Sequence, residues 1–103
     1  MMKGTVTIGE LFTTTAVIAQ ATNYTRPVAV VDGVNDFPFC FGNCSYPTDQ
    51  AAAVQPVLYP SVAPSDFGSY LAPVAGHGLN LHYSSAGAYQ YIQNFLNSHG
   101  LGA

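Results

Sequence analysis

The sequence predicts an α/β fold built on a pair of parallel strands. Two largely apolar runs, Val28–Val31 and Phe67–Ala72, are each followed closely by turn-forming residues, as buried strands are. Residues with helical spacing follow the second run, and a shorter helix is expected between the two runs. Because parallel strands need a long crossover connection, this alternation of strand and helix is typical of an α/β sheet.

The N-terminal part of the chain is predicted to be a helical lead-in that spans residues 1–25. The capping box Thr7-Ile8-Gly9-Glu10 predicts a helix from about Ile8 to Gln20, because its threonine and glutamate side chains can satisfy free N–H groups of the first turn. Pro27 then opens the first strand. Residues 26–103 are expected to form the α/β part.

The segment between the strands is predicted to contain one short helix. Pro38 predicts an extended path through the aromatic, cysteine-containing stretch Phe37–Tyr46. A helix is expected from Thr48 to Gln55, with Thr48 as its cap and Pro56 as its stop. The prolines from Pro56 to Pro64 predict irregular structure.

The last helix is predicted to begin near Ser84 or Ser85, either of which can cap it, and to end before Gly100. His99 would lie in its last turn, where a cation suits the helix dipole. We therefore expect His99 to be a capping or surface residue and not a catalytic one.

The composition indicates the interior-rich portion of a larger protein. Of the 103 residues, 49% are hydrophobic and 7% charged, against roughly a quarter charged in average soluble domains. A two-stranded sheet is also marginal in water, so the chain is expected to need the rest of a domain. The net charge of −3 without a basic cluster argues against nucleic acid as a partner. No apolar run is long enough for a membrane span.

The two cysteines, Cys40 and Cys44, are too few for a zinc site, which needs three or four ligands. His77, His82 and His99 show no zinc-finger spacing. We therefore expect no metal and no cofactor. A disulfide between the cysteines fits if the chain meets an oxidising compartment.

Two sequons, at Asn23 and Asn43, point to the same extracellular environment, as acceptors for N-glycosylation. The N-terminus is not a convincing signal peptide. Glu10 and the threonine run at 13–15 interrupt the apolar stretch that such a signal requires.

Two side chains with catalytic potential follow the predicted strands. Asp36 comes shortly after Val28–Val31, and His77 comes shortly after Phe67–Ala72. Because the carboxyl ends of parallel strands meet at one edge of a sheet, the two side chains are expected to lie together. A general-base histidine needs such a carboxylate on its other ring nitrogen. Asp32 is the alternative acid, and a structural Asx turn is the alternative role of Asp36.

These residues carry a resemblance to the α/β-hydrolases. The segment Val30–Pro38 (Val-Val-Asp-Gly-Val-Asn-Asp-Phe-Pro) resembles the strand and loop that hold the catalytic acid of that family, and Ala75-Gly76-His77-Gly78 resembles its Gly-His loop. The Asp-Phe-Pro-Phe-Cys run and the Gly-His-Gly-Leu-Asn-Leu-His-Tyr segment are similar to secreted fungal α/β-hydrolases of the esterase/lipase-like type. The resemblance covers the chain from about Arg26 onward.

The resemblance implies a partial α/β-hydrolase fold, namely its C-terminal two parallel strands with flanking helices. It implies that Asp36 is the acid and His77 the base of a Ser-Asp-His triad. His82 is expected to be a pocket-wall or packing residue, and the two cysteines are expected to be structural. The aromatic residues of the intervening loop would line an acyl pocket or pack locally: Phe37, Phe39, Phe41 and Tyr46.

The sequence departs from the family in one decisive respect, because it contains no Gly-x-Ser-x-Gly nucleophile motif. We therefore expect a truncated segment that is inactive alone and whose parent is an extracellular serine hydrolase acting on a small-molecule acyl substrate. Its expected partner is the missing N-terminal half of the fold, joined to it or on a separate chain. The alternative is a small, non-catalytic secreted protein that binds a ligand through its aromatic loop.

Overall fold

The fold is described from a computed structural model, which covers residues 7–8 and 19–102. Residues 9–18 of the predicted N-terminal helix lie outside this range, and Ala19 and Gln20 are not helical. The elements that follow are the strands β1 (Val28–Gly33) and β2 (Phe67–Ala72), the helices α2 (Phe37–Cys40), α3 (Gln50–Leu58) and α4 (Ser85–Ser98), and the 3₁₀ turns η1 (Pro64–Asp66) and η2 (Leu79–Leu81).

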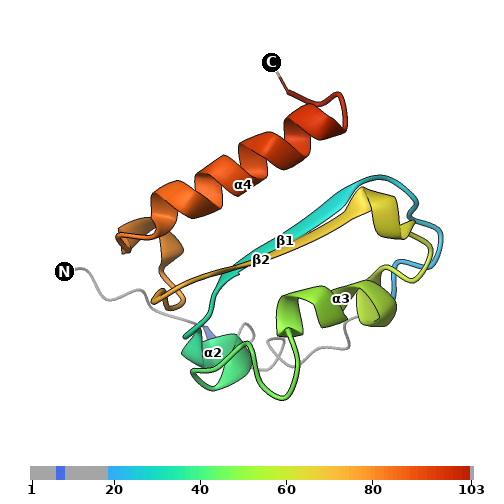
Figure 1. The fold of residues 1–103 in the computed structure, drawn as a ribbon. Coiled ribbons are helices and arrows are strands. Elements are labelled where there is room, and N and C mark those ends of the chain that lie inside the picture. Colours follow the sequence, from blue (N-terminus) through green and yellow to red (C-terminus); the bar gives the residue numbers. More distant parts are fainter. Residues whose placement is uncertain (1–6, 9–18, 103) are drawn as a thin grey trace.

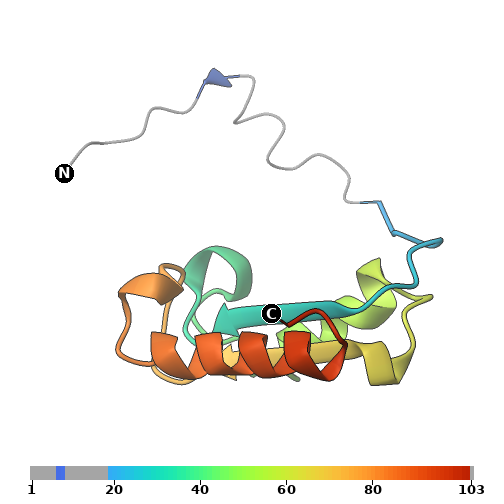
Figure 2. The same cartoon turned by 90° about the horizontal axis from the view of Figure 1, so that it is seen from above.

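The two strands form a parallel sheet, as predicted. Val28 of β1 lies opposite Phe67 of β2, and Gly33 lies opposite Ala72. Helix α4 covers one face of this sheet and α3 the other, so the elements stack in three layers (Figure 1). In the view from above, α4 runs along the strands (Figure 2). The α/β class with flanking helices is therefore confirmed, and β1 extends two residues beyond the predicted Val31.

The predicted extended path through Pro38 is wrong, because Phe37–Cys40 forms one helical turn. Asp36 stands at the cap position, and its side chain accepts a hydrogen bond from the Phe39 N–H. A proline in the first turn of a helix loses no hydrogen bond, since the N–H groups there have no intrahelical partner. A cap and a tolerated proline together explain this turn.

The bounds of the predicted middle helix are also corrected. Helix α3 is capped by Asp49, whose Oδ1 accepts a hydrogen bond from the Ala52 N–H at 2.9 Å, and not by Thr48. Pro56 lies inside the helix and does not stop it. A proline near a helix end removes one backbone bond, and the Tyr59 N–H still donates to the Gln55 carbonyl at 2.8 Å.

The last helix agrees closely with the prediction. Ser84 takes the cap position of α4, although its side chain makes no capping hydrogen bond. Gly100 follows the helix with a φ of +68°, the left-handed conformation that glycine adopts after many helices. None of the described helices combines the length and the hydrophobicity that a bilayer crossing requires.

The hydrophobic core between α4 and the sheet is made of small residues. Ala72, Ala75 and Ala88 are fully buried there, and larger side chains such as Val31 and Tyr70 are only partly buried against them. Many large apolar side chains of the described residues are exposed instead, among them Val57, Val74, Leu81 and Tyr83. The core therefore buries few of the large apolar side chains of the described residues.

His99 caps the last turn of α4, as the sequence predicted. Its Nδ1 lies 2.8 Å from the Phe95 carbonyl, and its Nε2 lies 3.2 Å from the Ser65 carbonyl and 3.5 Å from Asp66 Oδ1. Both ring nitrogens can donate to these acceptors only in the imidazolium form. The hydrogen bond to the Phe95 carbonyl, with smaller contributions from Ser65 and Asp66, therefore raises the pKa of His99.

This contact should make stability depend on pH. A raised pKa means that folding favours protonated His99, so its contribution is complete below the ordinary value of 6.5 and is lost as the pH rises through the raised value. Replacing His99 with glutamine should therefore lower the free energy of unfolding more at about pH 5.5 than at about pH 8.5. Urea unfolding at both values measures this, and an equal loss at both would contradict it.

Candidate functional site

The loops that follow the two strands bring Asp36 and His77 together. Asp36 lies just after β1 and His77 lies beyond β2, and the two residues are 41 positions apart in the chain. His77 Nδ1 is 2.8 Å from Asp36 Oδ2. The structure thus places these two predicted site residues in direct contact at the carboxyl edge of the sheet.

The Asp36 carboxylate is buried, with 1% of its surface exposed. Burial opposes its ionisation, but the Phe39 N–H at 2.9 Å from Oδ1 and the His77 ring on Oδ2 outweigh this, and the pKa of Asp36 is lowered. Asp36 is therefore favoured in its ionised form, and its negative charge lies beside the His77 ring. The same carboxylate also has a structural role, because it caps α2.

Asp32, the alternative acid, occupies a different position. Its Oδ1 accepts a hydrogen bond from the Gly33 N–H at 2.7 Å, and it is Asp36 that binds the imidazole. Burial, and then the neighbouring Asp36 carboxylate, raise the pKa of Asp32. Of two interacting carboxyl groups, Asp32 is therefore the one that more readily carries a proton, and Asp36 the one that carries the charge.

The imidazole of His77 is oriented on one side and open on the other. Its side chain is 57% exposed, although Nδ1 is engaged by the buried carboxylate. The Phe39 ring packs beside it, with the ring centroids 5.4 Å apart. When Nδ1–H donates to Asp36, the neutral ring keeps a lone pair on Nε2. The arrangement can therefore accept a proton at Nε2 and stabilise the resulting imidazolium.

Backbone contacts between the two loops fix this geometry. The Asn35 N–H donates to the Ala75 carbonyl at 2.8 Å, and the Val34 N–H donates to the Ala72 carbonyl at 2.9 Å. Gly33 lies so close to the second loop that a Cβ atom on it would be 2.3 Å from the Ala75 oxygen. Only glycine permits this approach. Gly33 therefore allows the loop that carries Asp36 to contact the loop that carries His77.

The second loop also contains strained backbone. Val74 has a φ of +51°, a left-handed conformation that is costly for a β-branched residue. Its side chain is exposed, so packing of this side chain does not explain the conformation. The surrounding hydrogen bonds must hold the loop in place.

A disulfide between Cys40 and Cys44 closes the turn after α2. Cys44 is buried, and its N–H donates to the Val34 carbonyl at 2.8 Å, which ties the disulfide to the end of β1. The two sulfurs and an Asp32 oxygen lie within 4.8 Å of one another. Because the sulfurs are bonded to each other, this group offers no thiolates to a metal.

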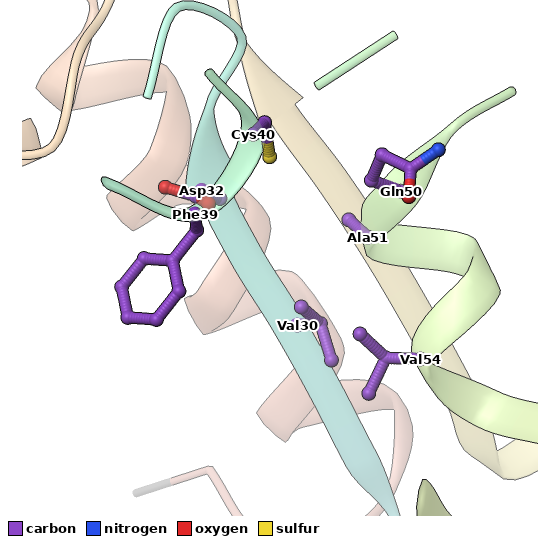
Figure 3. A pocket seen from close by; sticks show the side chains of 7 residues that line it. All are labelled: Val30, Asp32, Phe39, Cys40, Gln50, Ala51 and Val54. Carbon is purple, nitrogen blue, oxygen red and sulfur yellow. The ribbon is translucent and has the colours of Figure 1, made fainter. Parts of the chain in front are cut away.

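A largely apolar cavity of about 320 Å³ lies between β1, α2 and α3 (Figure 3). In Figure 3, Val30 of β1 and Val54 of α3 point toward one another across it. The cavity is lined by Val30, Asp32, Phe39, Cys40, Gln50, Ala51 and Val54. Phe39, one of these lining residues, also packs beside His77. Sequence reasoning foresaw aromatic residues near the site but not the contribution of α3.

The remaining predicted site residues are accounted for as follows. The aromatic residues of the loop are exposed: Phe37, Phe39, Phe41 and Tyr46. Asn23 and Asn43 are exposed as well, and the Asn43 side chain accepts hydrogen bonds from Ser45. His82 does more than pack, because its Nε2 lies 3.2 Å from the Gly76 nitrogen. The order of residues alone carries no signal for that bond.

Comparison of the chain with protein-family models, with curated proteins and with solved structures finds no match.

Proposed function

We propose that this chain supplies the acid and the base of a Ser-Asp-His triad and is the C-terminal part of an extracellular α/β-hydrolase. The intact enzyme would hydrolyse a carboxylic ester or a similar acyl bond of a small molecule. The observation that carries the proposal is a buried carboxylate, Asp36, bound to Nδ1 of an exposed histidine, His77, at the carboxyl edge of a parallel sheet.

The chemistry follows from this geometry. His77 Nε2 would take the proton of a serine hydroxyl as that oxygen attacks the acyl carbon, and Asp36 would stabilise the imidazolium. The same nitrogen would then return the proton to the leaving alcohol. Since the sequence contains no Gly-x-Ser-x-Gly, the chain alone has no activated serine and should form no acyl-enzyme.

The surface of the chain supports an incomplete domain. Leu81 is 91% exposed, and Val57 and Tyr83 are exposed as well. Large apolar side chains that gather in one area of a surface mark contact sites in soluble proteins. A two-stranded sheet with a core of alanines also buries little area. The remaining strands and the nucleophile of the proposed hydrolase would cover these residues.

The proposal is tested on the transcript and on the polypeptide it encodes. We expect an in-frame Gly-x-Ser-x-Gly upstream of the codon for Met1, and we expect the joined polypeptide to hydrolyse p-nitrophenyl butyrate. His77→Ala should abolish this activity, and His99→Gln serves as a matched control because His99 lies at the other end of α4. An upstream sequence without the motif, or a joined polypeptide that is inactive, would contradict the proposal.

The exposed aromatic patch of Phe37, Phe39, Phe41 and Tyr46 favours a second candidate, a non-catalytic secreted binding protein. Mass analysis of the naturally produced protein separates the two candidates. A mature product that begins near Thr22 would support the binding protein, whereas a larger polypeptide that contains the serine motif would support the hydrolase.

A further inference from the structure

His82 is bound to the loop that carries His77. Its Nε2 accepts a hydrogen bond from the Gly76 N–H at 3.2 Å. A ring nitrogen that accepts a hydrogen bond must keep its lone pair, so the neutral ring carries its proton on Nδ1. His82 thus acts here as a hydrogen-bond acceptor in a defined tautomer.

The peptide group that His82 holds joins Ala75 to Gly76, the residue before His77. Its N–H, from Gly76, donates to His82, and its carbonyl, from Ala75, accepts a hydrogen bond from the Asn35 N–H at 2.8 Å. The group is therefore held at both ends, from the Asp36 loop on one side and from His82 on the other. Fixing both ends fixes the plane of this peptide and the direction in which the chain enters Gly76, the residue before His77.

His82 is itself well anchored. Its backbone N–H donates to the Leu79 carbonyl at 3.1 Å, and its own carbonyl accepts a hydrogen bond from the Ser85 N–H at 3.1 Å. These bonds attach it to η2 and to the first turn of α4, which packs on the sheet (Figure 1). The ring therefore links the first turn of α4 to the loop that carries His77.

We propose that His82 is a positioning residue for His77. Its effect on catalysis rests on the function proposed above. Its acceptor nitrogen holds the Ala75–Gly76 peptide so that His77 Nδ1 faces Asp36 Oδ2. The same loop contains strained backbone, because Val74, two residues before Gly76, has a positive φ. Strained backbone persists only where its surroundings over-determine it.

The test compares His82→Gln with His82→Met in the full chain. The two side chains have nearly the same shape, but only the glutamine amide oxygen is a good acceptor. We expect His82→Met to accelerate amide hydrogen exchange at Gly76 by at least about tenfold, with exchange at Val34 changing by less than about twofold. The low-field proton signal of His77 Nδ1–H should broaden or vanish in the same variant. His82→Gln should keep both readouts within about threefold of the wild type.

The outcomes separate a positioning role from simple packing. Unchanged exchange at Gly76 in His82→Met, or equal acceleration in both variants, would overturn the proposal. If His82→Met unfolds the whole chain, the His82→Gln variant decides. Retained protection of the Gly76 amide from exchange and a retained His77 Nδ1–H signal would support the proposal. Loss of both would overturn it. A purely steric role would be met equally well by both side chains.

Activity provides a separate readout in the joined polypeptide. There, His82→Met should lower kcat about tenfold with little change in KM, because a misplaced base slows the proton transfer and not substrate binding. His82→Gln should restore most of the rate. If no variant, including the wild type, hydrolyses esters while the exchange results hold, the proposed function fails and the positioning role stands.

Discussion

Gly33→Ala is expected to destabilise the protein by about 3 kcal/mol, since inserting a methyl group into closely packed backbone cannot be relieved by rotating a side chain. The added Cβ would lie 2.3 Å from the Ala75 oxygen and 2.6 Å from the Gly76 oxygen. Either β1 or the His77 loop must move, and the hydrogen bond from the Asn35 N–H to the Ala75 carbonyl lies directly at that contact. The variant should therefore lose the Asp36–His77 contact together with its stability.

Urea unfolding followed by circular dichroism measures the loss for Gly33→Ala. The matched control is Gly78→Ala, in the same loop region. A Cβ there would meet only Leu81 Cδ1 at 3.6 Å, an ordinary contact distance. The control should therefore stay within about 1 kcal/mol of the wild type. A Gly33→Ala variant as stable as its control would show that the two loops do not approach as closely as described.

Asp36→Asn is expected to have the second large effect, a loss of about 1–3 kcal/mol at neutral pH, because it removes a buried charge that binds two donors. The asparagine oxygen can still accept the Phe39 N–H. Its NH₂ group would then face His77 Nδ1, which would have to accept a hydrogen bond and carry its proton on Nε2 instead. That is the wrong tautomer for a base, so ester hydrolysis by the joined polypeptide should fall by about 10⁴-fold.

The stability loss of Asp36→Asn should depend on pH in a defined direction. Because the pKa of Asp36 is lowered by folding, its ionised form is favoured in the folded state. Its contribution is therefore present above the ordinary carboxyl value of 3.8 and is lost as the pH falls through the lowered value. Unfolding free energies of the two proteins should differ most at about pH 7, and the difference should shrink as the pH falls below 3.8. A difference that stays constant with pH would contradict an ionised Asp36.

Local sequence signals predicted those elements whose stability is encoded nearby. The strand Phe67–Ala72 and the C-terminal helix were predicted almost to the residue, because an apolar run and a C′ glycine are local properties. Predictions failed where two local signals competed. At Pro38 a helical turn formed although proline disfavours helix, because Asp36 caps the turn and the proline lies in its first positions. At Pro56 the helix continued because the lost hydrogen bond lies near its end.

The candidate site shows the same division. The order strand, Asp36, strand, His77 was sufficient to predict that the two side chains share one edge, since the carboxyl ends of parallel strands coincide. The sequence favoured Asp36 but left Asp32 as an alternative, because both come within five residues after the predicted strand Val28–Val31. That choice depends on which carboxylate the loop turns toward His77, and the structure assigns it to Asp36.

By itself, the sequence determined the α/β class, the parallel pairing, the pair of candidate residues and the lack of a serine motif. Only the tertiary structure decided that Asp36 is buried on Nδ1 of His77, that Gly33 must lack a side chain, and that His82 holds the Ala75–Gly76 peptide. The physical reason is that periodicity and caps act over a few residues. Burial, close approach and hydrogen bonds between loops depend instead on residues that meet only when β1, β2 and α4 have packed together.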